Sequence, residues 1–167
     1  MPDPLHFDTH AEVYDRARPP YPAVLWAELR DLGLLRPGIL AIDLGAGSGL
    51  ATGPLLEAGA SVDAVEPGPG LAERLRQRCP AAVVHVETAE QIELSTGVYD
   101  LAVAATAVHW FDLGVVVPKL HRALRPGGHF AVWRNAFGDP NVPVTPFRAR
   151  VDQIVARRTV AEPSRAR

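Results

Sequence analysis

The chain has 167 residues, of which 47% are hydrophobic and 22% are charged, so it can form one domain with a sizeable core. Its net charge of −2 excludes a general polyanion-binding surface, and we expect no nucleic-acid partner. The sequence contains one cysteine, which excludes an internal disulfide, and no stretch approaches the roughly 18 apolar residues of a membrane span. The first residues lack the basic-then-apolar pattern of a signal peptide, so we expect a cytoplasmic protein with no membrane association.

The first elements along the chain lead into a glycine-rich loop. A helix is predicted over 22–33, where proline stands at the start, apolar residues follow at helical spacing and glycine ends the pattern. The apolar strand predicted over 39–44 contains Asp43 and is followed by Gly45, Gly47 and Gly49 at alternating positions. Such glycines let the backbone approach a ligand closely or adopt a positive φ, and the helix that follows presents unpaired N–H groups. The loop predicts a nucleotide or nucleoside site, although a tight turn without a ligand has the same pattern.

A second acid follows the next predicted strand. Residues 61–66 alternate toward Glu66, and Pro67 then ends the strand. Glu66 lies about 20 residues beyond the first glycine, where the ribose-binding acid of a nucleotide fold belongs. Its carboxylate can accept hydrogen bonds from both ribose hydroxyls, and the alternative is a surface glutamate at a strand end.

The chain then continues to alternate between helices and strands. The pattern predicts a helix over 70–78, strands over 82–87 and 99–105, a helix over 113–124 and a strand over 129–133. Pro118 must kink the fourth of these elements or stand near its true start. Strands separated by helices form right-handed βαβ units, so we predict an α/β fold with a doubly wound, mostly parallel sheet and helices on both faces. Ligands bind such sheets at the carboxyl ends of the strands, where Asp43, Glu66, Ala89 and Thr106 fall.

Two segments resemble a known family. The run 43–49, Asp-Leu-Gly-Ala-Gly-Ser-Gly, resembles motif I of the class I S-adenosylmethionine-dependent methyltransferases, and 124–128, Leu-Arg-Pro-Gly-Gly, resembles the turn before a later strand of that family. The resemblance covers residues 7–135 and is greatest to the small-molecule methyltransferases of the type 11 group. It implies a Rossmann-like fold, S-adenosyl-L-methionine as the cofactor and a small-molecule acceptor.

The resemblance assigns cofactor-binding roles residue by residue. It implies that Asp43 helps to anchor the amino group of the cofactor, that Ala89 flanks the adenine ring, and that Glu90 or a nearby backbone group meets the exocyclic amine. Glu90 can equally be a solvated acid at the start of a helix. The cofactor-binding residues implied in this way are Asp43, Gly45, Ala46, Gly47, Gly49, Glu66, Pro67, Ala89, Glu90, Thr106, Tyr14 and Arg18.

The lead-in over residues 1–21 resembles the aromatic, arginine- and proline-containing segment that folds over the cofactor in this group. The resemblance implies that Arg18 pairs with the methionine carboxylate and that Tyr14 packs on the cofactor. The alternative is a proline-rich leader with a solvated arginine. We favour the lid interpretation because loops carry function more often than the elements they connect.

His109 is the candidate catalytic residue, because it follows the predicted strand 99–105 at the end where an acceptor would enter. Its imidazole can orient the acceptor or take a proton near neutral pH. The alternative is a histidine that caps a turn while Trp110 and Phe111 pack inward. We expect no metal site, since the sequence has neither a His-Glu-x-x-His motif nor paired Cys-x-x-Cys motifs.

The resemblance ends near residue 135. Residues 136–167 are expected to form a loop, a helix over 146–158 and a basic tail, and nothing after Val132 has strand periodicity. We therefore expect the C-terminal strand pair of the family to be missing, which leaves a fifth strand exposed unless a homodimer contact, a partner or the C-terminal helix covers it. The chain is thus divided into an N-terminal lid (1–21), an S-adenosylmethionine-binding domain (22–135) and a C-terminal loop, helix and tail (136–167).

Three functions remain open. The leading one is S-adenosylmethionine-dependent methyl transfer to a small-molecule acceptor by in-line displacement. The second is a protein that binds S-adenosylmethionine but is catalytically incomplete, because the strand pair is missing. The third, a nicotinamide-dependent oxidoreductase, is disfavoured because Leu50 stands where a dinucleotide site needs its third glycine and because no Tyr-x-x-x-Lys pattern is present.

Overall fold

The computed structural model describes residues 19–135 and 144–158. The elements in chain order are α2 (Ala23–Asp31), β1 (Leu40–Leu44), α3 (Thr52–Glu57), β2 (Ser61–Val65), α4 (Pro69–Arg78), β3 (Val83–His85), β4 (Tyr99–Ala105), the 3-10 turn η2 (Val108–Trp110), α5 (Leu113–Ala123), β5 (Leu124–Trp133) and α6 (Pro146–Arg158). Tyr14 and Arg18, to which the sequence assigns cofactor contacts, lie outside the described residues.

The strands form one sheet in the order β3-β2-β1-β4-β5, and every neighbouring pair is parallel. Asp43 of β1 stands opposite Ala64 of β2 on one side and Val103 of β4 on the other. The strand order therefore reverses between β1 and β4, which is where a ligand crevice opens in a sheet of this kind. The predicted α/β fold with a doubly wound parallel sheet is confirmed.

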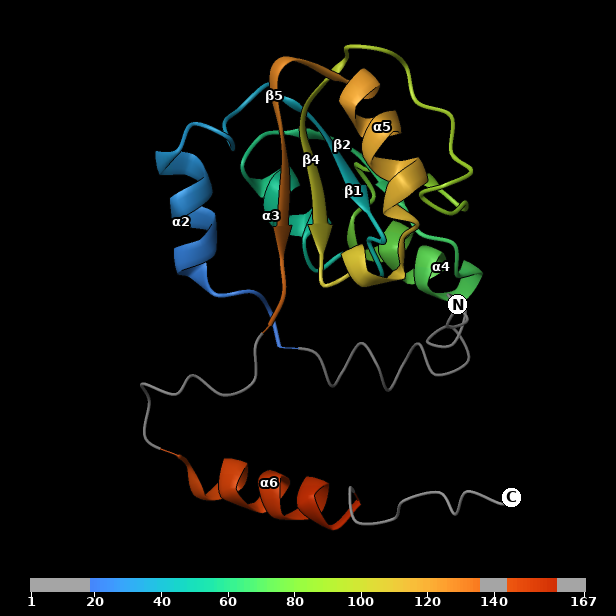
Figure 1. The fold of residues 1–167 in the computed structure, drawn as a ribbon. Coiled ribbons are helices and arrows are strands. Elements are labelled where there is room, and N and C mark those ends of the chain that lie inside the picture. The colour runs from blue at the N-terminus through green and yellow to red at the C-terminus, as the bar shows by residue number, and fades with distance from the viewer. Residues whose placement is uncertain (1–18, 136–143, 159–167) are drawn as a thin grey trace, which may run out of the picture. The chain divides into compact units, whose positions relative to one another are not determined.

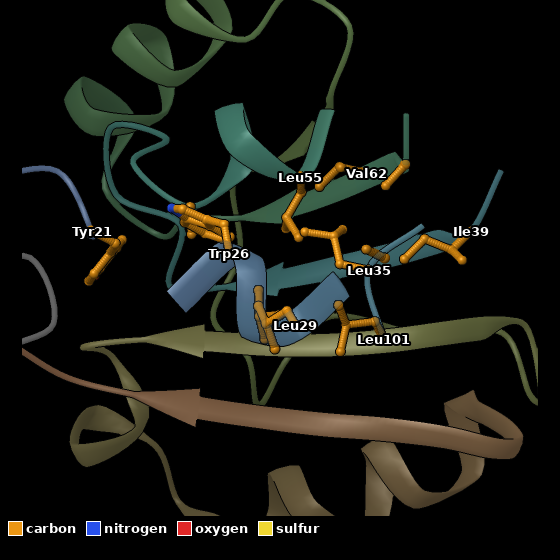
Figure 2. Packing of buried hydrophobic residues seen from close by; sticks show 12 residues of the cluster. Tyr21, Trp26, Leu29, Leu35, Ile39, Leu55, Val62 and Leu101 are labelled. Carbon is orange, nitrogen blue, oxygen red and sulfur yellow. The ribbon is translucent and has the colours of Figure 1, made fainter. Parts of the chain in front are cut away.

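Helices cover both faces of the sheet (Figure 1). Trp26 and Leu29 of α2 and Leu55 of α3 pack on one face together with Val62 and Leu101, as Figure 2 shows. Side chains alternate along a strand, so the neighbouring residues of β1 and β4 point to the opposite face. There the buried residues of α5 are Val116, Leu120 and Ala123, which pack with Ile42, Leu44 and Ala102.

α5 begins at Leu113, as predicted, with the Asp112 side chain accepting a hydrogen bond from the Gly114 N–H at 2.9 Å, so Pro118 lies inside the helix rather than near its start. Other element boundaries differ from the sequence-based expectation. β5 begins at Leu124 instead of residue 129, and its pairing with β4 shifts register between Tyr99 and Leu101. β5 is nevertheless an edge of the sheet in the part of the chain that the structure describes.

The chain divides into two compact units, Met1–Arg134 and Asn135–Arg167. The first contains the whole sheet, and the described part of the second contains α6, whose bounds are those expected from the sequence. No helix in the described residues is long and apolar enough to cross a membrane.

Candidate functional site

A pocket of about 520 Å³ opens at the carboxyl ends of β1, β2 and β4. Three segments form its walls: the glycine loop after β1, the turn after β2 and the segment between β4 and α5. The segment after β3 completes the lining. The lining residues are Gly45, Gly47, Glu66, Pro67, Leu71, Thr88, Ala89, Glu90, Gln91, Ala105, Thr106, Ala107, Trp110, Phe111, Asp112 and Val115. The volume lies in the range of sites that enclose a cofactor-sized small molecule.

The three glycines of the loop meet different steric demands. All have positive φ, at +68° for Gly45, +58° for Gly47 and +91° for Gly49, a region that side chains rarely allow. A Cβ on Gly45 would lie 2.6 Å from Cβ of Ala107, and one on Gly49 would lie 2.7 Å from Cδ1 of Leu75. A Cβ on Gly47 would meet nothing within 4 Å. Packing therefore requires glycine at position 45, the positive φ favours it at position 49, and Gly47 leaves open space in the wall of the pocket.

Glu66 ties the glycine loop to the end of β2. Its side chain is buried, at 5% exposure, and its Oε2 accepts a hydrogen bond from the Gly47 N–H at 2.9 Å. Its Oε1 accepts another from the Gly68 N–H at 2.8 Å. A carboxylate of this kind can accept hydrogen bonds from ligand hydroxyl groups. These contacts fix the orientation of the carboxylate before any ligand binds.

Asp43 lies at the end of β1 and is completely buried. Its Oδ2 accepts a hydrogen bond from Thr52 Oγ1 at 2.7 Å, whereas its Oδ1 has no partner among the described residues. Burial raises the pKa of Asp43 to about 7, the Thr52 hydrogen bond opposes this rise, and the negative charge of Glu66 adds to it. One buried carboxylate oxygen thus remains for a donor brought to the site.

The segment after β3 forms the opposite wall and is held by two connections. Glu90 Oε1 accepts a hydrogen bond from the backbone N–H of Asp112 at 2.8 Å, which joins this segment to the start of α5. The Lys119 ammonium donates to three backbone carbonyls, those of Ala89 at 3.2 Å, Ile92 at 2.8 Å and Glu90. A single lysine therefore fixes the turn that contains Ala89 and Glu90.

The described residues of this site match those of a known family. The methyltransferase domain family matches residues 42–132, which run from β1 to the end of β5. The chain belongs to the class I S-adenosylmethionine-dependent methyltransferases. S-adenosylmethionine is therefore its cofactor.

Three similar proteins illustrate the relationship. An uncharacterized methyltransferase of Mycobacterium tuberculosis is 38% identical over 130 residues, which are 77% of this chain and 52% of that protein. The solved structure of a protein from Anaeromyxobacter dehalogenans, provisionally called a type II methyltransferase, is 37% identical with a TM-score of 0.64, over 84% of this chain and 55% of the other. An S-adenosylmethionine-dependent methyltransferase from Mesorhizobium loti is 28% identical with a TM-score of 0.59, over 66% and 52%. The chain spans about half the length of each of these relatives.

The residues of this pocket fit S-adenosylmethionine, the cofactor of the family. Gly47 leaves space at the pocket wall, the Glu66 carboxylate is oriented toward the pocket, and Asp43 keeps one buried oxygen without a donor. Two carboxylates and an open backbone loop suit a ligand that carries ribose hydroxyls and a positive charge. Within the described residues, no three histidine, cysteine or acidic side chains gather as a metal site would need.

The structure brings most of the predicted site residues of the methyltransferase together. Those that line the pocket are Gly45, Gly47, Glu66, Pro67, Ala89, Glu90 and Thr106. Asp43, Ala46 and Gly49 lie behind this wall, where Ala46 packs near Leu75 of α4. Their contacts with the cofactor stay predictions.

His109 follows β4 as expected but does not line the pocket. It belongs to η2 but its side chain is exposed, and it is absent from the residues that line the pocket. Its ring centroid is 5.1 Å from that of Trp110, which does line the pocket together with Phe111. The alternative in which these two aromatic residues face inward therefore describes this turn better. The catalytic role of His109 stays a prediction.

Several residues of the pocket were missed in the sequence. Leu71 enters from the first turn of α4, and Asp112 and Val115 enter from the start of α5. The helix start at Asp112 has a readable signal, an aspartate at the N-cap position. The role of Lys119 in holding the turn after β3 has no such signal in the sequence, because a lysine on an amphipathic helix ordinarily faces solvent.

Proposed function

We propose that this chain carries the cofactor-binding and methyl-transfer site of an enzyme that methylates a small molecule by in-line displacement. The observation that carries the proposal is the pocket itself, in which the glycine loop, Glu66 and the Ala89–Glu90 turn face one another. When bound, S-adenosylmethionine supplies an electrophilic methyl group, so the protein has no need of a nucleophile of its own. The task of the residues is to align the acceptor, and orientation contributes roughly 7–11 kcal/mol to such reactions.

The proposal gives each acid a separate role. Glu66 binds the ribose hydroxyls, because its carboxylate lines the pocket and is held in place by the N–H groups of Gly47 and Gly68. Asp43 attracts the amino group through its unpartnered Oδ1. Ala89 and Glu90 lie where the adenine is expected, held by Lys119 and Asp112.

The acceptor side of the pocket is the segment between β4 and α5. Thr106 and Ala107 lie at the strand end, and Trp110 and Phe111 add apolar surface to the same pocket. This lining supports a small acceptor with an apolar part. In the proposal His109 orients the acceptor or takes its proton, and Tyr14 and Arg18 complete the cover of the cofactor.

The proposal includes two points about the whole protein. The single cysteine and the ordinary composition support a cytoplasmic location. The exposed edge of β5 supports further pairing there, by another segment, a partner or a second copy.

The proposal is tested by incubating the protein with S-adenosylmethionine and a panel of small hydroxyl, carboxyl and amine compounds, while the release of S-adenosylhomocysteine is measured. Release that depends on one compound and is lost in Glu66→Gln supports it. Binding of S-adenosylhomocysteine without turnover of any compound would contradict the catalytic part.

A further inference from the structure

The backbone of Thr106 is unusual. Among the described residues it is the only one other than glycine with a positive φ, at +60°. A β-branched side chain makes this conformation more unfavourable than it is for asparagine or aspartate. Thr106 directly follows β4 and lines the pocket. A conformation of this kind persists only when its surroundings hold it, and such positions gather at functional sites.

Two contacts hold Thr106, and both come from distant parts of the chain. Its backbone N–H donates to the carbonyl oxygen of Trp133, at the end of β5, over 2.7 Å. Its hydroxyl shares a hydrogen bond of 3.0 Å with the hydroxyl of Tyr21, which lies 85 positions earlier in the chain. The first contact continues the β4–β5 pairing, whereas the second is made by a side chain that belongs to no strand of the sheet.

Tyr21 is itself held firmly. It is 8% exposed, and its ring lies edge-on to two tryptophan rings. The distance between ring centroids is 6.3 Å to Trp26 and 5.7 Å to Trp133. Figure 2 shows Tyr21 just before the helix that carries Trp26. The two tryptophan rings also meet edge-on at 5.7 Å. Packing against aromatic neighbours on both α2 and β5 fixes where the Tyr21 hydroxyl points.

The position of Thr106 matters for the residues that follow it. Cβ of Ala107 lies so close to Gly45 that a Cβ there would be only 2.6 Å away, and the Phe111 ring would lie 3.5 Å from that same Cβ. The segment after β4 therefore rests directly on the glycine loop. A change in the Thr106 backbone would displace Ala107 from this contact and alter the width of the pocket between them.

We propose that Tyr21 is a positioning residue of the pocket, whose hydroxyl holds Thr106 in the left-handed conformation and so keeps the segment 106–111 against the glycine loop. This inference rests on the proposed function, because it takes the pocket to be the cofactor site. It adds a residue that does not line the pocket and to which the sequence assigned no contact with the cofactor. It also gives the proline-flanked end of the lead-in a defined effect on the site.

The test is a double-mutant cycle on the full chain. Tyr21→Phe removes the hydroxyl and keeps the ring packing, while Thr106→Gly replaces the strained residue by one that adopts positive φ without strain. Affinity for S-adenosylhomocysteine is measured by calorimetry for the wild type, both single variants and the double variant. We expect Tyr21→Phe to weaken binding about three- to tenfold in the Thr106 background and less than twofold in the Thr106→Gly background.

A second measurement needs no ligand. Hydrogen exchange of the backbone amides over 106–111 should accelerate at least threefold in Tyr21→Phe and should not accelerate further when Tyr21→Phe is added to Thr106→Gly. Tyr99→Phe is the matched control, since it removes a tyrosine hydroxyl that donates to Asp63 Oδ2 at 2.6 Å, at the other end of β4. This control should leave both the exchange over 106–111 and the affinity unchanged.

The outcomes separate the two claims. Equal effects of Tyr21→Phe in both Thr106 backgrounds, or unchanged exchange over 106–111, would overturn the positioning role. If the wild type folds but binds no S-adenosylhomocysteine, the proposed function is contradicted, and the exchange measurement still decides whether Tyr21 positions Thr106.

Discussion

The two sides of the pocket are held in different ways. On the side of β1 and β2, a side chain that itself lines the pocket holds the backbone, since the buried Glu66 accepts hydrogen bonds from the N–H groups of Gly47 and Gly68. On the side of β4, side chains far along the chain hold the backbone, as Tyr21 holds Thr106. The first side should therefore respond to changes in residues that line the pocket, such as Gly45 and Glu66, whereas the second should also respond to residues that do not line it.

The same contrast extends to the turn after β3. Lys119 of α5 reaches three carbonyls in this turn, so its shape depends on a helix that lies outside it. We therefore expect the segment after β4 and the turn after β3, rather than the glycine loop, to adapt to an acceptor. Substitutions at different places in the pocket should consequently differ in whether they lower the free energy of unfolding or the affinity for S-adenosylhomocysteine.

The largest effect is expected from Gly45→Ala. Its φ of +68° strains any side chain, and the new Cβ would lie 2.6 Å from that of Ala107. We expect a loss of about 3 kcal/mol or more in the free energy of unfolding, measured by urea denaturation. Gly47→Ala is the matched control, because it has a similar φ but meets nothing within 4 Å, so it should lose less stability and mainly affinity. Equal losses of stability would contradict the steric account of this side.

The next largest effect concerns pH and Asp43. Its pKa is raised to about 7 by burial, above the value near 4 expected in the unfolded chain, so the folded state binds more protons between these values. The contribution of this group to the free energy of unfolding is therefore greatest below about pH 4. It falls by a few kcal/mol as the pH rises to about 7 and does not change further at higher pH.

Asp43→Asn isolates this effect. We expect the difference in unfolding free energy between wild type and Asp43→Asn to move in favour of the variant from pH 5 to pH 8, in parallel urea titrations. The amide keeps an oxygen for the Thr52 hydroxyl, so that contact need not be lost. A difference that does not change with pH would show that Asp43 is ionised throughout.

Glu66→Gln should act on affinity more than on stability. The amide removes the negative charge and one set of acceptor positions, and we expect binding of S-adenosylhomocysteine to weaken at least about tenfold in calorimetry. Glu73→Gln, on the exposed part of α4, makes the same chemical change away from the pocket and should bind as the wild type does. Similar affinities for the two variants would remove the ribose role from Glu66.

The smallest effect is expected from Lys119→Met. The variant keeps the apolar stem but leaves three carbonyls of the turn after β3 without their donor. We expect about threefold weaker binding and a stability loss of about 1 kcal/mol, because water can replace part of the lost hydrogen bonding. Arg122→Met, one turn later on the exposed part of α5, serves as the control. An affinity equal to the control would mean that the turn keeps its shape alone.

Much of the fold and half of the pocket could be predicted from the sequence, since they depend on local rules. The glycine loop, the acid at the end of β2 and the alternation of strands and helices all follow from backbone conformation and periodicity. The bounds of α6 were predicted for the same reason. The strand order was expected only in outline, because parallel pairing is decided by contacts between distant segments.

The rest depends on tertiary contacts that leave no local pattern. The strained φ of Thr106 could not be inferred, because threonine rarely adopts it and its partner Tyr21 belongs to the lead-in. The exposure of His109 follows from Trp110 and Phe111 taking the inward positions of the same short turn. In both cases the residue type is compatible with more than one conformation or degree of exposure, and contacts with distant residues decide which one is adopted.

The most direct test of the central claim is calorimetric titration of the purified chain with S-adenosylhomocysteine, with NAD as the comparison ligand. The account predicts micromolar binding of S-adenosylhomocysteine and none of NAD. Binding of NAD in preference, or binding of neither ligand by a folded chain, would contradict the assignment of this pocket.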